Sequence, residues 1–503
     1  MRNRNVQDAW AYHNETKHSP ESVRSNVHFL DWANRPLLFK IYPDLEPMPL
    51  PRDMLQSGVA ALSAIATRGV PERDATPSLR AITSLLYFSA GVTRRRGEIL
   101  FRAAACTGAL YEVELYLACG ALQDLDAGLY HFNPGDLSLR RLRAGDYRGV
   151  VAAAAGHDEA IERAPAIVIA TGTYFRNAWK YQARTYRHFG WDNGTLTANL
   201  LAIAAALGLP ARLVCGFVDE AINRLLGVDV KREVALTLLA AGHSGAPAPA
   251  PPPMPALDLE TVPVSKQEVD YPAMRAMHAA SSLEAPEEVV AWREALEAPP
   301  PDAACGEQFI PIEPLSDAAI PRDTIEEVVQ RRGSSRRFTG GSIRFTELST
   351  ILDRATHGIP ADFPAMNDIY LIVNSVEGLR QGSYFFHPGQ GRLEVLSHGD
   401  FRARAAFLAL EQQLAGDAAA AVFFLADLRR WLGQLGNRGY RAAQLEAGIL
   451  GGKIYLASYA LGLGATGLTF YDDEVGRFFG PHADGKSTIF LTAVGQPAKP
   501  RPS

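Results

Sequence analysis

Hydrophobic and polar positions follow two patterns along the chain, which predict short strands and long buried helices. Residues 194–209 and 448–463 are long, rich in alanine and apolar on every face, which indicates helices buried in a large interface. Short runs rich in β-branched and aromatic residues predict strands at 113–119, 211–219, 234–242, 368–374, 465–473 and 487–495. Strands separated by long helices favour an α+β fold with a central sheet.

The chain also repeats itself. Tyr130 and Phe132 recur as Tyr384 and Phe386, each 254 residues later. Further pairs share this spacing: Pro134/Pro388, Gly135/Gly389, Leu139/Leu393, Leu142/Leu396, Gly145/Gly399, Asp146/Asp400, Arg148/Arg402, Arg184/Arg438, Tyr186/Tyr440, Arg187/Arg441, Asp192/Glu446, Gly194/Gly448, Leu207/Leu461, Phe217/Tyr471 and Asp219/Asp473. Chance does not hold one register over so long a stretch. We therefore expect a tandem duplication, with two units paired about a pseudo-two-fold axis through a helical interface.

Composition divides the chain around these two units. Residues 242–258 are rich in proline and alanine and lack apolar periodicity, which predicts an extended, semi-rigid spacer. Residues 267–297 carry a helical pattern that we expect to pack on the outside. We therefore expect an N-terminal leader at 1–50, a first unit at 51–245, a linker at 246–265, a helical connector at 266–320 and a second unit at 321–503.

Composition and charge exclude several classes of protein. The 503 residues are 47% hydrophobic and 21% charged with a net charge of -5, which is ordinary for a soluble globular protein and gives no basic surface for nucleic acid. No apolar run is long enough for a membrane helix, and the polar start lacks the apolar core of a secretion signal. The four cysteines (Cys106, Cys119, Cys215 and Cys305) show no CxxC spacing. We expect reduced thiols in a cytoplasmic protein, without a metal site.

The second copy opens with a motif that suits a phosphate. Arg332, Ser334 and Arg336 alternate, so two guanidinium groups and a hydroxyl converge on one side of an extended segment. Guanidinium groups make bidentate, charge-assisted bonds to phosphate oxygens. A solvated basic run before a helix would give the same pattern. Counting back from the shared helix end, the first copy has isoleucine, threonine and glycine at these places within 65–69, which cannot cradle a phosphate.

The first copy has two features that the second lacks. A loop of small residues, 105–109, precedes the strand at 113–119, and such loops let backbone groups approach a planar ligand, although a plain tight turn explains it equally. Lys180 and Tyr181 stand side by side, whereas glutamine and leucine occupy 434–435. Such a pair offers a donor and a general acid–base group near a redox centre, although an amphipathic helix surface fits it too.

Together these motifs resemble the FMN-dependent nitroreductase superfamily, through RxSxR at 332–336, the small-residue loop and the helix end ALGLGATG at 460–467. More narrowly, the loop segment 102–117, the segment 180–194 and the leader within 12–43 look like SagB-type dehydrogenases. That group includes the thiazoline and oxazoline oxidases of peptide natural-product biosynthesis. The fold that the resemblance implies is two nitroreductase-like units, each with a central sheet.

The resemblance implies one flavin site per chain. In dimers of this superfamily FMN lies at the interface, with its phosphate on the RxSxR of one subunit and its ring against the small-residue loop of the other. Each copy here keeps one half, so the mirror-image site should be lost. The implied catalytic residues are Lys180 and Tyr181. The implied cofactor-binding residues are Arg332, Ser334, Arg336, Cys106, Thr107, Gly108, Leu110, Gly464, Thr466, Gly467, Lys499 and Arg501.

The implied activity is that of an FMN-dependent dehydrogenase or oxidase. It would oxidise an azoline or a related heterocycle, in a peptide or small molecule, by hydride transfer to flavin N5. Alternatives are nicotinamide-driven reduction of nitro or quinone compounds, a protein that only binds or sequesters flavin, and a scaffold without flavin. Partner proteins of a peptide-modifying pathway and a further homodimer are compatible with this reading; nucleic acid and membrane partners are not expected.

Some positions depart from these motifs. The loop has Ala105 and Cys106 where the family usually has proline and serine, Glu112 replaces a later proline, and Thr195 replaces a common histidine. Cysteine keeps the small size but weakens the hydrogen bond, so these changes bear on substrate and activity more than on flavin binding. The glycines within 462–467 match a dinucleotide-binding pattern, but they end a helix and precede a strand, which reverses the required order.

Overall fold

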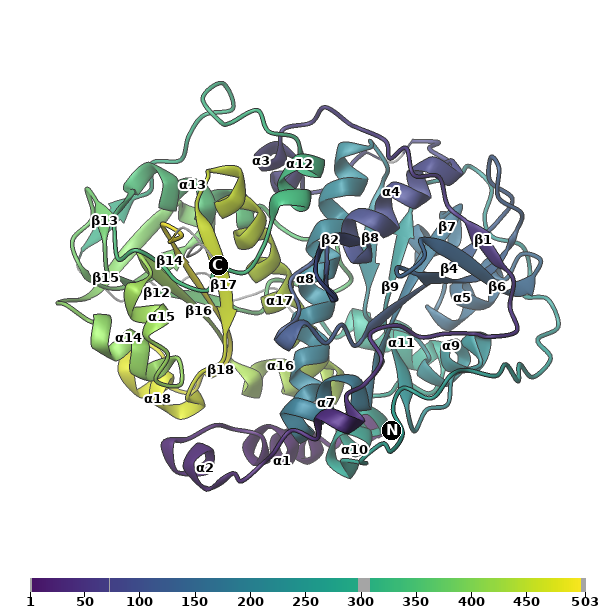
Figure 1. Cartoon of the computed structure of the whole chain (residues 1–503), viewed down its shortest axis with the longest axis horizontal. Helices are drawn as coiled ribbons and strands as arrows, with labels where there is room; N and C mark the ends of the chain where they lie inside the picture. The colour runs from purple at the N-terminus through teal and green to yellow at the C-terminus, as the bar shows by residue number, and fades with distance from the viewer. Residues whose placement is uncertain (1, 72, 297–307, 499–503) are drawn as a thin grey trace.

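The computed structural model describes residues 2–71, 73–296 and 308–498, and two long helices run through its middle between two sheets (Figure 1). Of the predicted site residues, Lys499 and Arg501 lie outside the described ranges, as does Cys305. The other three cysteines form no disulfide. Within the described ranges, no helix is long and apolar enough to cross a membrane.

The two sheets are built alike. Each has seven strands, in the orders β1-β6-β5-β4-β7-β9-β8 and β10-β15-β14-β12-β16-β18-β17, so every strand of one has a counterpart in the other. The strands of the first sheet are β1 Pro47–Pro49, β4 Val113–Cys119, β5 Gly128–Asn133, β6 Ser138–Ala144, β7 Ala166–Thr173, β8 Ala211–Val214 and β9 Glu233–Ala241. Those of the second are β10 Phe309–Pro311, β12 Asp368–Val373, β14 Gly382–His387, β15 Arg392–His398, β16 Ala420–Ala426, β17 Gly464–Leu468 and β18 Ser487–Gly495. The prediction of two α+β units in one chain is confirmed.

In each sheet, the strand at one edge comes from a segment that the sequence assigned to the leader or to the connector rather than to the unit itself. β1 lies in the predicted leader and pairs with β6, and β10 lies in the predicted connector and pairs with β15. The shorter elements are α3 Ala61–Ala66, α4 Leu79–Ala90, β2 Val92–Arg96, β3 Ile99–Arg102, α5 Arg148–Ala154, α6 Glu159–Arg163, α7 Tyr174–Tyr181, α9 Asp219–Leu226, α12 Ile325–Arg331, β11 Ile343–Arg344, α13 Phe345–Ala355, β13 Val376–Glu377, α14 Arg402–Leu408, α15 Gln413–Asp417, α16 Leu428–Leu435 and α18 Asp472–Phe479.

The central helices are α8 Thr185–Ala206 and α17 Asn437–Ala460, and both begin before the apolar runs that predicted them. They cross at Gly194 and Gly448, where a Cβ on Gly194 would lie 2.6 Å from the Cα of Gly448. Only glycine allows two helices to approach so closely. The two glycines are 254 residues apart in sequence, so the crossing point lies where a pseudo-two-fold axis would pass.

Two arginines at the start of each central helix also reach the other unit. Asp472, the first residue of α18, accepts from Arg184 at 3.0 Å and from Arg187 at 2.6 Å. In the same way Asp219, the first residue of α9, accepts from Arg438 and Arg441. Burial alone would raise the pKa of Asp472, but the two arginines outweigh it and hold that pKa well below its usual range.

This network corrects two sequence pairings. Four residues separate β8 from α9, and only three separate β17 from α18. The spacing of 254 therefore becomes 253 beyond this loop, which pairs Asp219 with Asp472 rather than Asp473, and Phe217 with Phe470 rather than Tyr471.

The leader and the connector lie across the interface. The leader contains η1 Arg2–Arg4, α1 Gln7–Glu15, α2 Pro20–Ser25 and η2 Trp32–Asn34, and it follows one edge of both units (Figure 1). Asn3 donates to the carbonyl of Leu435 at 3.1 Å, and the indole of Trp179 donates to the carbonyl of Asp31 at 2.9 Å. The connector contributes α10 Pro272–Ala280 and α11 Pro286–Glu294, which bury Trp292. The linker residues 246–265 form neither helix nor strand.

Candidate active site between the two units

The RxSxR segment of the second unit contacts the loop-bearing part of the first. Arg332 caps the end of α12 and is buried. Its Nε donates to the carbonyl of Ala103 and its Nη2 to the carbonyl of Arg102, both at 2.9 Å. These bonds leave its third nitrogen, Nη1, for another acceptor. The structure therefore brings the RxSxR segment against the residues that lead into the predicted ring loop.

The structure also corrects which residues of the first copy correspond to this motif. Helix α3 ends at the C-cap Thr67 as α12 ends at the C-cap Arg332. The starts of the two helices, however, pair with a spacing of 264, since the N–H of Ala61 donates to the carbonyl of Asp323 and the N–H of Ile325 donates to that of Val59. At that spacing Arg68 corresponds to Arg332 and Val70 to Ser334, so the first copy has an arginine at the first position but no hydroxyl at the second.

A short chain of hydrogen bonds joins the RxSxR segment to β17. The Ser334 hydroxyl lies 3.2 Å from the Tyr455 hydroxyl, which accepts the N–H of Gly467 at 2.5 Å. The N–H of Ser335 donates to the carbonyl of Ala465 at 2.9 Å. Ser334 is thus linked through Tyr455 to Gly467 of β17.

The predicted ring loop is held by a carboxyl group on α8. Thr107 begins the short helix η3 Thr107–Ala109, and its N–H and hydroxyl both donate to Asp192 at 2.9 Å. Gly108 follows with a φ of 64°, a left-handed conformation that favours glycine. In the second unit Glu446 accepts the N–H of Asn367 at 2.9 Å, so the recurring acid holds a loop in both copies. The sequence signal that could have identified Asp192 was its recurrence as Glu446, an acid at the same position of both long helices.

A thiol and two carboxyl groups meet beneath this loop. Cys106 Sγ lies 3.3 Å from Glu112 Oε2 and 3.3 Å from Asp192 Oδ2, and it accepts the N–H of Tyr111 at 3.1 Å. Burial, with help from the neighbouring carboxyl groups, raises the pKa of Cys106 and of Asp192. The three ligand atoms lie within 4.8 Å of one another, a spacing compatible with a metal ion, whereas the sequence predicted none. A thiol that donates its one proton to Glu112 and accepts a hydrogen bond from a protonated Asp192 accounts for the geometry equally well.

Tyr181, at the end of α7, contacts Gly108. A Cβ on Gly108 would lie 2.8 Å from the Tyr181 hydroxyl, so the two residues are in direct contact. Burial raises the pKa of Tyr181, the acids of the loop raise it further, and Arg336 of the second unit opposes them. Tyr181 therefore keeps its proton at neutral pH. Lys180 is exposed, with its Nζ 5.2 Å from the centre of the Tyr181 ring.

Two other predicted residues are buried. Leu110 packs with Phe175, Trp179 and Tyr181 on one side of the loop. The nearest hydrogen-bond acceptor of the Thr466 hydroxyl is the carbonyl of Gly467, at 3.5 Å. We therefore place both residues in the support of the site rather than on its surface.

The chain itself fills the mirror-image position. The N–H of Leu213 on β8 donates to the carbonyl of Pro360 at 2.8 Å, and the carboxylate of Asp362 accepts from the N–H groups of Cys215 at 2.7 Å and Gly216 at 2.8 Å. At the equivalent place on β17, the N–H of Gly467 bonds only to a side-chain hydroxyl. The two edges therefore differ in the groups that bond to them.

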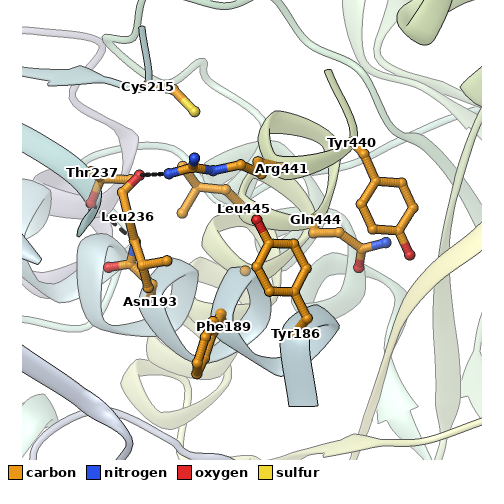
Figure 2. A pocket seen from close by; sticks show the side chains of 11 residues that line it. Tyr186, Phe189, Asn193, Cys215, Leu236, Thr237, Tyr440, Arg441, Gln444 and Leu445 are labelled. Atoms are coloured by element: carbon orange, nitrogen blue, oxygen red, sulfur yellow. Dashed lines mark hydrogen bonds between the residues drawn. The ribbon is translucent and has the colours of Figure 1, made fainter. Parts of the chain in front are cut away.

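Two cavities lie near the central helices. One, of about 270 Å³, adjoins the loop and is lined by Ala104, Ala105, Cys106 and Asp192 among others. Another, of about 350 Å³, lies between α8 and α17 and contains none of the predicted site residues. Figure 2 shows Tyr186, Phe189 and Leu445 in it, with Arg441 bonded to the carbonyl of Leu236.

Comparison with known proteins agrees with this geometry. Residues 48–243 match the model of the Nitroreductase family. The match extends over nearly all of the first unit. A protein of Methanocaldococcus jannaschii named "Putative nitroreductase MJ1384" is 28% identical over 201 residues, which is 40% of this chain and 93% of that protein. A solved structure from Anabaena variabilis, also described as a nitroreductase, has 26% identity and a TM-score of 0.77, and the match covers 98% of this chain and 99% of that one. The two-unit arrangement thus has a counterpart of the same extent.

Proposed function

We propose that this chain is an FMN-dependent oxidoreductase with one flavin site assembled from both units. The observation that carries the proposal is the contact of the RxSxR segment with the residues that lead into the ring loop, at Arg332 and the carbonyls of Arg102 and Ala103. The family match of the first unit supports an oxidoreductase. The filled edge of β8 supports a single site, because Asp362 already uses the backbone donors there.

The described residues fit FMN. Ser334, Arg336 and the free nitrogen of Arg332 would hold the phosphate, with Lys499 and Arg501 proposed to add charge. The ring would lie between β17 and the loop 106–108. Ser335 Oγ and Thr469 Oγ1 are buried and have no hydrogen-bond partner among the described residues, which is expected beside an absent polar ligand. When bound, FMN supplies the two-electron chemistry by accepting a hydride at N5 and passing electrons to oxygen or another acceptor.

The protein's own contribution is to orient the substrate and to manage a proton. Tyr181 is an O–H donor at neutral pH because burial raises its pKa. Lys180 is exposed beside it, where it can contact a substrate that arrives from solvent. Thr107 and Gly108 are fixed by Asp192 and present backbone groups to the same space. We propose Lys180 and Tyr181 as the catalytic pair.

We further propose an azoline or related heterocycle, in a peptide or small molecule, as the substrate class. The resemblance to SagB-type dehydrogenases supports this choice, as does the exposure of Lys180 and Gly108, which leaves room for a large substrate. The reaction removes two hydrogens from the ring, one as a hydride to the flavin and one as a proton. It belongs in the cytoplasm, where thiols such as Cys106 remain reduced.

Flavin content and turnover test this proposal. The purified chain should carry one FMN, and Arg332→Ala with Arg336→Ala should remove most of it, because each charged contact is worth about 1.5–3 kcal/mol. Lys180→Ala and Tyr181→Phe should keep the flavin and lose oxidation of an azoline peptide. A colourless protein, or two FMN per chain, would refute the single-site assembly. If the protein reduces nitro compounds or quinones with a nicotinamide and does not oxidise an azoline, the function is that of a reductase. If it holds flavin but turns over none of these substrates, it is a flavin-binding protein.

A further inference from the structure

The hairpin of β2 and β3 belongs to the first unit and reaches the RxSxR segment of the second. Arg94 lies in β2, and its Nη2 and Nη1 are 3.4 Å and 3.7 Å from the place where a Cβ on Gly333 would stand. The hydroxyl of Tyr459 is 3.5 Å from the same place. The Arg94 guanidinium therefore lies directly over the main chain between Arg332 and Ser334.

The positive charge gathered here is not neutralised by the protein. Within the described residues, Arg94, Arg332 and Arg336 each lack an ion pair with a carboxylate. Burial lowers the pKa of Arg332, and the charge of Arg94 lowers it further, which shows that the two groups repel each other. Arginines held together at this cost are typical of a site that binds an anion.

The hairpin holds Arg94 in place before any ligand binds. Arg94 faces Phe101 across the two strands, and its guanidinium lies 4.8 Å from the centre of that ring. The N–H of Ala103 donates to the carbonyl of Gly91 at 2.9 Å, which closes the base of the hairpin. Arg95, the next residue, points to the opposite face of the strand because side chains alternate.

We propose that Arg94 is a phosphate ligand contributed by the first unit, so that both units hold the phosphate of the flavin. The inference rests on the proposed FMN site and extends it, since the sequence motifs place the phosphate on the second unit alone. The phosphate dianion would bind between the Arg94 guanidinium and the Ser334–Arg336 side of the segment. Bound flavin would then tie the hairpin of one unit to the other.

Binding of FMN and riboflavin to the apoprotein tests this role, because the two ligands differ only in the phosphate. We expect Arg94→Ala to weaken FMN binding by at least ~10-fold, or ~1.4 kcal/mol, and riboflavin binding by less than twofold. Arg95→Ala, with the same loss of charge on the opposite face, should change neither. Arg94→Lys should restore part of the FMN affinity, since lysine keeps the positive charge but lacks the paired N–H donors of the guanidinium.

The outcomes separate the two proposals. If the unmodified protein prefers FMN to riboflavin and Arg94→Ala keeps that preference, the role of Arg94 is wrong and the flavin site stands. If Arg94→Ala and Arg95→Ala weaken FMN equally, a general charge effect replaces the specific contact, and the inference also fails. If the unmodified protein binds neither flavin, the proposed function fails and takes this inference with it.

Discussion

Replacing Asp472 by asparagine should destabilise the protein far more than the same change at Asp473. Asp472 is buried and pairs with Arg184 and Arg187, whose side chains are 4% and 0% exposed. It also accepts the N–H of His18 at 2.8 Å. Loss of its charge leaves two buried guanidinium groups uncompensated, and breaking a buried ion pair in this way costs about 3–5 kcal/mol.

Asp473 provides the matched control. Its carboxylate lies 2.8 Å from Lys17, but its side chain is 59% exposed. Exposed ion pairs contribute about 0–1 kcal/mol, and salt screens them. Thermal unfolding would therefore show a drop of about 6–10 °C for Asp472→Asn, at ~2 °C per kcal/mol for a domain of 250 residues, and at most ~2 °C for Asp473→Asn.

The pH dependence and the mirror variant sharpen the assay. The arginines hold the pKa of Asp472 below its usual range, so its stabilisation is complete above the unfolded carboxyl value of about 3.9 and declines as the pH falls below it. The difference between wild type and Asp472→Asn should therefore shrink in acid. Asp219→Asn, which breaks the equivalent pairs with Arg438 and Arg441, should match it within ~1 kcal/mol. An Asp473→Asn variant as unstable as Asp472→Asn would refute the structural register.

Three further changes test other parts of the structure. Gly108→Ala should lower the free energy of unfolding by about 1–2 kcal/mol and displace Tyr181, so turnover should fall. Gly97→Ala is the control: Gly97 has a similar φ of 58°, but its added Cβ would have no atom within 4 Å, so this variant should lose stability without losing turnover. Burial raises the pKa of Glu446 to about 7, so the wild-type protein should lose on the order of 3 kcal/mol of unfolding free energy relative to Glu446→Gln as the pH rises from 4 to 8. Denaturant titrations of both proteins measure this, and a difference between them that stays constant with pH would contradict it. Asp362→Ala should lower the free energy of unfolding by about 1.5–3 kcal/mol, since two backbone donors lose a charged acceptor, yet leave the flavin content at one per chain.

The sequence predicted the fold because the duplication preserves the spacing of buried positions. β4 and β18 follow the predicted runs closely, since fully buried strands read as unbroken apolar segments. The starts of α8 and α17 were missed because their first turns carry arginines that pair with the other unit, and hydropathy alone reads such turns as surface. Tertiary ion pairs between units have no local signature.

Pairing within the site was harder to predict than its location. The motifs indicated which stretches meet, but not that Arg332 would bond to the carbonyls of Arg102 and Ala103 or that Asp192 would hold the loop. The slip from a spacing of 254 to 253 was missed because two aspartates stand together at 472–473. Burial decides between them, and burial depends on the whole fold.

The asymmetry of the two units follows from a loop rather than from their cores. Both sheets have the same strand order, and both central helices place an acid at the same point to hold a loop. In the second unit that loop is short, so residues 360–362 lie against β8 and take up its backbone donors. In the first unit the longer segment folds into the β2–β3 hairpin, and the N–H of Gly467 on β17 bonds to a side-chain hydroxyl instead. One difference in loop length thus gives the two edges different partners, which supports the proposal of a single site.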